Sequence, residues 1–231
     1  ARLSRARVLL VPLLAALPVL ALLLALGTWQ VQRMHWKHDL LARIAASEAA
    51  PPVPLADPPE PFARAVTRGR FLHGRESLVG AEVRGNLLGA RLLTPLERAG
   101  APTVLVDRGW VPLQPRDPVS RPEGEVEVVG YVHPGDRAGM MSARDDPANR
   151  RFYTLDPPRI AEALELVGAE PYALVALADP AVAPGLPDPA RTLPRPTNPH
   201  LGYAVTWYGL ALSLCGVFAA FATRQMKDSP A

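Results

Sequence analysis

The chain has 231 residues, of which 48% are hydrophobic and 20% charged, and its formal net charge at neutral pH is +3. This average resembles that of a soluble protein, but the apolar residues gather at the two ends of the chain. No dense run of Lys and Arg is interleaved with aromatic residues, which argues against nucleic acid as a partner. The single cysteine, Cys215, lies in an apolar stretch, so there is no disulfide framework and no Cys-x-x-Cys metal or redox pair.

The first apolar run covers residues 8–27 and contains no charged side chain. Its length matches the roughly 20 residues that cross a bilayer as a helix, and the two prolines within it are tolerated in such helices. A cleaved signal peptide would have an apolar core of about 7–15 residues and a small-x-small cleavage site, and the residues after Gly27 offer no such site. We therefore predict an uncleaved transmembrane helix over 8–27, continuing to about residue 46, after a cytoplasmic tail at 1–7.

A second uncharged run, from Gly202 to Thr223, predicts a transmembrane helix over 200–223, followed by a cytoplasmic tail at 224–231. Two spans place both termini on the same side of the membrane. Positive charges near both termini indicate that this side is the cytoplasm, and they are Arg2, Arg5, Arg7, Arg224 and Lys227. Arg33, Lys37 and Arg43 flank the other end of the first helix, but the long intervening loop translocates largely regardless of charge. The middle of the chain is therefore predicted to be extracytoplasmic.

Two proline-rich stretches bracket this middle part. Pro51 to Pro61 contains six prolines, and Pro180 to Pro199 contains seven. Such segments are stiff and extended rather than packed, so we interpret residues 47–64 and 180–199 as linkers. The domain between them is expected to cover residues 65–179.

The domain has the pattern of short β-strands separated by turn residues. Strands are predicted at 65–72, 76–80, 90–97, 103–112, 125–133, 151–156 and 171–179. One helix fits residues 157–167, where Ile160, Leu164 and Val167 recur at helical spacing after two prolines. The predicted fold is therefore a membrane protein with two transmembrane α-helices flanking a mainly antiparallel β domain, barrel- or sandwich-like, with one or two helices.

Sequence signatures of catalysis are absent. There is no phosphate-binding glycine loop, no His-Glu-x-x-His and no nucleophile elbow. Asp145 and Asp146 lie in polar, turn-like sequence, and nothing near His73 or His133 completes a metal site. The adjacent Met140 and Met141 are more typical of a loop or core filler than of a soft-metal site. We expect no catalytic residue and no enzymatic activity.

Two stripes of side chains lie where the predicted helices leave the membrane. His200, Tyr203, Trp207 and Leu210 share one face of the second helix, and Trp29, Arg33, Trp36 and Lys37 share one face of the first. If the stripes face each other, they form an apolar slot with an imidazole and cations at its mouth. Haem requires this combination of an axial nitrogen, an apolar cleft and cations for its propionates. The alternative is an interfacial belt, in which Trp and Tyr act as anchors and the basic side chains snorkel.

Several segments resemble the surfeit-locus (Surf/Shy) family of cytochrome c oxidase assembly factors. Residues 26–44 resemble its opening LGxWQxxRxxWK motif, 69–80 its G-x-F-x-H-x-x-E segment, and 92–112 its strand pair ending in RGWVP. Residues 149–164 are similar to a later segment with aromatics and an aspartate, and 198–212 resemble the N-x-H-L-x-Y-A-x-T-W-F motif of the second helix. The departures are Gly-Ala-Glu at 80–82, where many members have Gly-Pro-Arg, and Tyr208 in place of Phe. His35 and His38 lie outside the family pattern.

The resemblance implies a non-enzymatic maturation factor for the catalytic subunit of the haem-copper oxidase, working with other oxidase assembly factors and acting around haem a. It also implies that His200, the histidine of the last motif, ligates haem iron. We hypothesise that Tyr203, Trp207 and Trp29 pack beside the ring, and that Arg33 and Lys37 meet the propionates. The competing hypothesis is a cofactor-free membrane scaffold that clasps the oxidase subunit.

Composition and the short N-terminal tail favour a bacterial inner membrane, with the main domain in the periplasm. The mitochondrial inner membrane is the alternative, with a transit peptide already removed.

Overall fold

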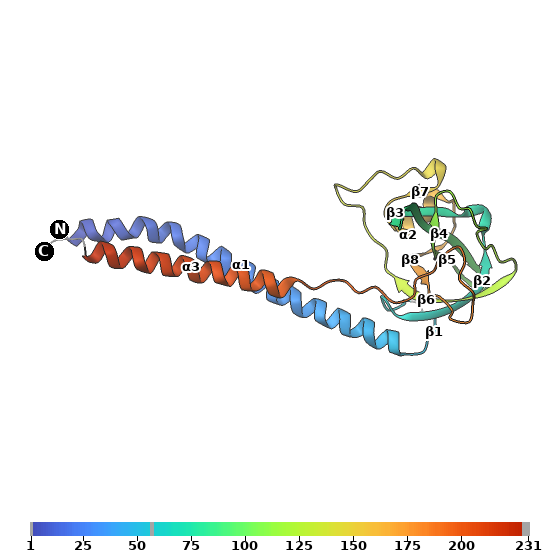
Figure 1. Cartoon of the computed structure of the whole chain (residues 1–231), viewed down its shortest axis with the longest axis horizontal. Coiled ribbons are helices and arrows are strands. Elements are labelled where there is room, and N and C mark those ends of the chain that lie inside the picture. Colours follow the sequence, from blue (N-terminus) through green and yellow to red (C-terminus); the bar gives the residue numbers. More distant parts are fainter. Residues whose placement is uncertain (1, 56–57, 228–231) are drawn as a thin grey trace. The chain divides into compact units, whose positions relative to one another are not determined.

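The computed structural model describes residues 2–55 and 58–227 (Figure 1). The chain divides into two compact units. One unit comprises residues 1–43 and 195–231, and the other comprises Ile44–Pro194.

The first unit is built from two long helices that lie side by side and antiparallel (Figure 1). Helix α1 spans Arg2–Ala49 and contains Pro12 and Pro18, and helix α3 spans His200–Lys227. Both are long and apolar enough to cross a membrane. Apolar side chains on both are exposed, as expected when lipid rather than protein covers them. The prediction of one candidate membrane helix at each end of the chain is confirmed.

The second unit is a β-barrel with short extensions. Its strands are β1 (Val53–Pro54), β2 (Arg64–Phe71), β3 (Ser77–Arg84), β4 (Leu87–Arg98), β5 (Ala101–Pro112), β6 (Glu125–His133), β7 (Arg151–Phe152) and β8 (Ala169–Ala176). Strands β2, β6, β8, β5 and β4 follow one another in the sheet, and a pairing of β2 with β4 closes the ring. Most pairings are antiparallel, while β5–β8, β1–β2 and β3–β7 are parallel. The predicted mainly antiparallel β domain is therefore confirmed, as a barrel.

The seam that closes the barrel depends on close backbone approach. There Arg70 pairs with Glu97 and Phe71 with Leu96. A Cβ atom on Gly69 would overlap the carbonyl oxygen of Glu97, so a residue without a side chain is required at this point.

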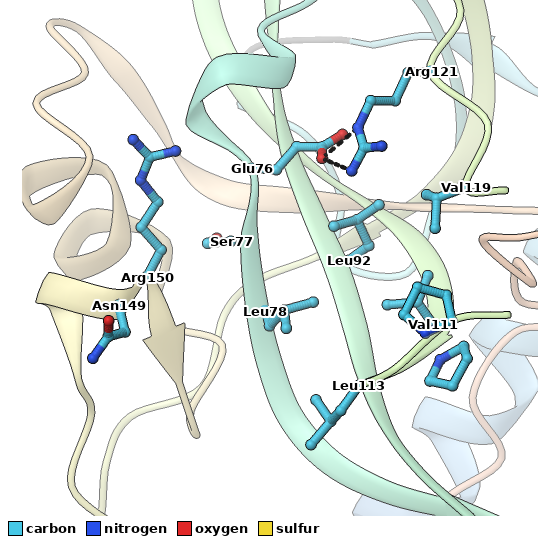
Figure 2. Close-up of a pocket in the computed structure, with 12 residues that line it drawn as sticks. Glu76, Ser77, Leu78, Leu92, Val111, Leu113, Val119, Arg121, Asn149 and Arg150 are labelled. Atoms are coloured by element: carbon cyan, nitrogen blue, oxygen red, sulfur yellow. Dashed lines mark hydrogen bonds and ion pairs between the residues drawn. The ribbon is translucent and has the colours of Figure 1, made fainter.

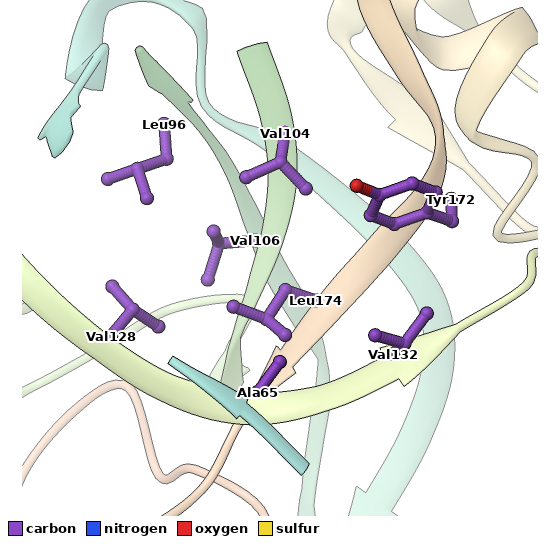
Figure 3. Close-up of a cluster of buried hydrophobic side chains, with 8 residues drawn as sticks. All are labelled: Ala65, Leu96, Val104, Val106, Val128, Val132, Tyr172 and Leu174. Carbon is purple, nitrogen blue, oxygen red and sulfur yellow. The ribbon is translucent and has the colours of Figure 1, made fainter. Parts of the chain in front are cut away.

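The barrel interior is filled by aliphatic side chains and one tyrosine (Figure 3). They come from every strand of the closed ring and are Ala65, Leu96, Val104, Val106, Val128, Val132, Tyr172 and Leu174. Alternation along β5 explains the arrangement, since Val104 and Val106 point inward while Leu105 points to the outer face. The core is thus a direct product of the period-two pattern.

A second core lies on the outer face of the barrel, beneath β7 and helix α2. Helix α2 spans Pro157–Ala163, and the Asp156 side chain caps its first turn by accepting a hydrogen bond from the Arg159 amide at 3.4 Å. Phe152, Ile160 and Leu164 bury their side chains against the strands. The helix ends at Ala163, before the predicted residue 167. Glu165, just after this end, adopts a left-handed conformation.

The second proline-rich stretch differs from the expected unpacked linker. Asp188 exchanges two backbone hydrogen bonds with Trp110, at 2.8 and 2.9 Å, and Ala190 pairs with Leu177. Leu193 is fully buried. Prolines prevent a regular strand here, but the residues between them still supply backbone groups that pair with the barrel.

A buried ion pair ties β4 to β8. Arg98 and Glu170 form a salt bridge with side chains only 8% and 7% exposed, and Arg98 also donates to the Pro102 carbonyl at 2.8 Å. Burial and the neighbouring Glu170 carboxylate raise the pKa of Tyr172 to about 12, so its phenol stays protonated. Because both charges are buried, removal of either side chain would leave the other without a counter-charge.

Replacing Glu170 with Gln is expected to destabilise the domain by about 3–5 kcal/mol, because the Arg98 guanidinium would remain buried without a counter-charge. The double variant Arg98→Met/Glu170→Leu should recover most of this loss, since it removes both charges together. Thermal unfolding of the full chain in nanodiscs measures the difference. Equal destabilisation by the single and double variants would show that the pair is not energetically coupled.

Candidate functional site

The start of α3 is held against α1 by a ladder of polar contacts within the helical unit. The Lys37 ammonium donates to the Thr197 carbonyl at 2.6 Å, and the Asn198 amide donates to the Met34 carbonyl at 3.2 Å. One step further along, the Nδ1 atom of His200 lies 2.7 Å from the Oε1 atom of Gln30. Lys37, Met34 and Gln30 lie at helical spacing on one face of α1. This face therefore fixes the register of the segment that begins α3.

The contact between His200 and Gln30 indicates which nitrogen of the imidazole carries a proton. Because the amide oxygen of Gln30 can only accept, the ring donates from Nδ1, and in the neutral imidazole the lone pair is then on Nε2. Gln30 is buried, and the ring of His200 is partly buried beside it. An imidazole oriented by a hydrogen bond from one nitrogen is the usual arrangement for a metal ligand at the other.

Close packing of small residues continues the helix contact into the apolar segment. Ala204 and Ala211 are buried on α3, and Gly27 is buried on α1. A Cβ atom on Gly27 would lie 2.9 Å from the Tyr208 ring. The Tyr208 hydroxyl lies 3.1 Å from the Thr28 hydroxyl. Small residues at the interface and a few polar contacts are the interactions that hold helices together in lipid.

The remaining predicted site residues are not all brought to this contact. Trp29 and Tyr203 are 53% and 55% exposed, and Trp207 is half-buried beside the interface. The Arg33 guanidinium lies 4.0 Å from the centroid of the Trp36 ring on the same helix. Of the two predicted stripes, Lys37 therefore contacts the segment before α3 and His200 contacts α1, while Trp29 and Tyr203 are largely exposed. The slot between the two stripes stays a prediction.

Gln30 is the residue that the sequence interpretation missed. It lies within the segment that resembles the LGxWQ motif, and it is the first hydrogen-bonding amide after the uncharged run. An uncharged polar side chain at the end of an apolar helix is a usable signal. The sequence does not show which face of α1 meets α3, so this signal alone does not identify Gln30.

A second polar cluster lies in the barrel unit, around Glu76. Its carboxylate accepts from Arg121 through two nitrogens, at 2.8 and 2.9 Å, and also contacts Arg108 at 3.4 Å and His73 at 3.0 Å. Burial lowers the pKa of the Arg108 guanidinium, and the Glu76 carboxylate partly offsets this. Because Arg108 and His73 also hold the carbonyls of Ser120 and Pro122, the cluster fastens the loop over residues 113–124 to the barrel. We call this segment the 113–124 loop.

A pocket of about 280 Å³ lies between the 113–124 loop and strands β3, β4 and β5 (Figure 2). Its apolar lining includes Leu78, Leu92, Val111, Leu113 and Val119. Arg121 and Arg150 stand on its rim, and Figure 2 shows Leu113 at the opposite end from Arg121. Its size is just below the roughly 300–1,000 Å³ of pockets that hold drug-sized ligands. It suits one or two side chains rather than a haem.

A row of titratable side chains crosses another part of the outer barrel face. Asp107 and Tyr131 both neighbour Val175 in the sheet, and the Asp107 carboxylate forms an ion pair with Arg91 at 2.6 Å. Burial raises the pKa of Asp107 against the opposing effect of Arg91. Burial also raises the pKa of Tyr131. The pKa of His133 is lowered by burial, which outweighs the opposing effect of Asp136.

Comparison with known proteins identifies the family. Residues 17–212 match the SURF1 family. The chain belongs to this family. Surfeit locus protein 1 of Xenopus tropicalis is 34% identical over 211 residues, which cover 80% of this chain and 67% of that protein. The Homo sapiens protein of the same name is 33% identical over 223 residues, covering 86% and 72%, and that of Takifugu rubripes is 30% identical over 227 residues, covering 87% and 93%.

The segments that resemble SURF1 family motifs fall on the two clusters described above. The first and last motifs supply Gln30, Lys37 and His200 of the helix contact. The second and third supply Glu76 and Arg108, which fasten the 113–124 loop. The described residues 2–55 and 58–227 contain no group of three His, Cys, Asp or Glu side chains that could hold a bare metal ion.

Substituting Gly27 with Ile should loosen the helix pair, because the new side chain would collide with the Tyr208 ring. Gly209→Ile provides the matched control, since a Cβ atom there meets nothing within 4 Å. Thermal stability of the full chain in detergent micelles should fall for Gly27→Ile and change little for Gly209→Ile. The same fall in both variants would contradict this packing.

The domain is expected to lose stability as pH falls below about 6.5, the ordinary pKa of histidine, because folding lowers the pKa of His133. In that range the unfolded state binds a proton that the folded imidazole resists, and the Nδ1 atom of His133 accepts from the Gly135 amide at 3.1 Å. The loss is complete below the folded-state pKa. Melting curves between pH 7 and 5 should show a smaller decline for His133→Gln than for wild type. Parallel declines in the two proteins would contradict the assignment of the effect to His133.

Proposed function

We propose that this chain assists the maturation of the catalytic subunit of cytochrome c oxidase by holding haem a at His200 before hand-over. Membership of the SURF1 family implies a role in cytochrome c oxidase assembly, and an assembly role rather than a catalytic one. The observation that carries the haem step is the orientation of the imidazole. Gln30 engages Nδ1, so Nε2 carries the lone pair that iron requires.

The residues around His200 fit such a cargo in chemistry. A haem needs only an axial ligand from the protein, because its macrocycle supplies the equatorial nitrogens. A single oriented imidazole, without further clustered ligands in the described residues, suits this requirement better than it suits a bare ion. Half-buried Trp207 offers an apolar surface near the same end of α3.

Cations for the propionates are present on α1. Lys37 uses its ammonium group to hold Thr197, and an ammonium has further N–H groups that can donate to a carboxylate. Arg33, stacked on Trp36, is exposed and retains its in-plane donors. In this proposal Lys37 meets one propionate beside His200, and Arg33 supplies long-range attraction. Tyr203 and Trp29 are exposed, so both are free to pack beside the ring.

The proposed setting is a bacterial inner membrane, with the barrel in the periplasm. The two apolar helices support membrane association. The named relatives from Xenopus tropicalis and Homo sapiens fit the mitochondrial inner membrane as the alternative setting. In either setting the helix contact lies at the boundary where an oxidase subunit in the same membrane can be reached.

The test is haem retention by the full chain purified from cells that make haem a. His200→Ala should remove most of the Soret absorbance per protein without changing the amount in the membrane. Gln30→Leu should weaken haem affinity roughly 10- to 100-fold, as loss of an outer-shell partner does. His38→Ala is the matched control, because this exposed histidine also lies on α1. Haem content that is unchanged in His200→Ala would leave only a cofactor-free clasping role.

A further inference from the structure

None of the residues that line the pocket under the 113–124 loop belongs to the contact between α1 and α3. The pocket is therefore a separate candidate binding site. Its floor is continuous with an exposed apolar strip on the same face of the sheet. Leu88 lies two residues before Ala90 on β4, so the two side chains point to the same face of the sheet. Ala90 pairs with Val111 of the pocket lining, and Leu88 pairs with Val83. Val83 and Leu88 are 65% and 50% exposed. A partly open apolar pocket next to such a strip is typical of a docking surface.

The outer edge of β3 beside this strip is open. Strand β7 pairs with β3 only at Leu78 and Val79. Beyond them, Gly80 has φ of 70°, and the register shifts before Glu82. The Gly80 carbonyl accepts a hydrogen bond from the Arg151 side chain, and within the described ranges 2–55 and 58–227 no strand covers the outer edge of β3 from Ala81 to Arg84. Unpaired backbone at a strand edge is the feature that extended peptides use when they bind by strand addition.

The rim of the pocket is positively charged. Arg121 is bound to Glu76, but Arg108 shares the same carboxylate, so two guanidinium groups face one negative charge. Arg150 stands on the other side, where one of its nitrogens donates to the Gly74 carbonyl. Both guanidinium groups have further donors, which match carboxylates in geometry. The rim therefore favours a ligand that carries a carboxylate beside the apolar group that fills the floor of the pocket.

We propose that this pocket docks an extended segment of a partner polypeptide that presents an apolar side chain beside a carboxylate. The apolar side chain fills the space between Leu78, Leu92 and Val119, as anchor residues do at protein interfaces. The carboxylate meets Arg121 or Arg150, and the backbone of the segment runs along the open edge of β3. A lipid could fill the apolar floor and contact the arginines on the rim, but it could not pair with the backbone edge of β3.

The test selects an mRNA-displayed library of short random peptides on the full chain in nanodiscs and measures the enriched peptides by fluorescence polarisation. Enriched sequences should place Leu, Phe or Met beside Asp or Glu. Their affinity should fall at least about tenfold for Leu113→Trp, which fills the pocket, and for Arg150→Glu, which reverses the rim charge. Val167→Trp and Arg144→Glu are matched exposed controls and should bind as wild type does.

Peptides that bind Leu113→Trp as well as they bind wild type would overturn the proposal. So would an enriched set without acidic residues, or displacement of the peptides by an equimolar oleate probe, which would assign the pocket to lipid. Equal melting temperatures for the two pocket variants and the two controls would exclude misfolding. If Leu113→Trp misfolds, Arg150→Glu decides alone. None of these substitutions touches His200 or Gln30, so the outcome is independent of haem binding.

Discussion

The hydrogen bond between Gln30 and His200 is the constraint on which the proposed chemistry depends. It joins a buried amide on one long helix to the first residue of the other, and the contacts of Lys37 and Asn198 fix the same register. At a membrane boundary such a contact is favourable, because neither polar group can be buried in lipid without a partner. An imidazole held in this way has a defined tautomer. A freely rotating surface histidine does not.

The helix packing below this contact explains how it can be maintained. Gly27 allows the Tyr208 ring to lie directly against α1, and Ala204 and Ala211 bring the backbones close. In lipid there is little hydrophobic gain from bringing two apolar helices together, so close packing and a few hydrogen bonds must supply the attraction. The polar ladder is thus both the candidate ligand site and part of what holds the helix pair.

Much of the fold could be predicted from the sequence, because its signals are local. Uncharged runs of about 20 residues identify the spanning helices, and alternation identifies strands such as 103–112. The closure of β2 onto β4 and the parallel pairing of β5 with β8 could not be predicted, since they join residues far apart in the chain. The pairing of Asp188 with Trp110 was hidden for another reason. Prolines mask the strand pattern while leaving the backbone between them free to pair.

The site was predictable only in part for a similar reason. Periodicity shows which side chains share a face of a helix, but not which face meets its neighbour. The aromatic stripe at Trp29 was therefore as plausible as the face of Gln30, and only the packed helix pair distinguishes them. Helical spacing placed His200 and Lys37 among the candidate residues, and the resemblance to a known family then pointed to His200 as the haem ligand. The loop-fastening role of Glu76 was missed because its partner Arg121 lies 45 residues away.

The most direct measurement is the ¹⁵N chemical shift of the His200 ring nitrogens in the full chain, labelled at histidine and embedded in nanodiscs. The account predicts that Nδ1 is protonated and Nε2 carries the lone pair, and that Gln30→Leu abolishes this preference. A spectrum showing the proton on Nε2, or a ring that does not respond to the change at residue 30, would contradict it.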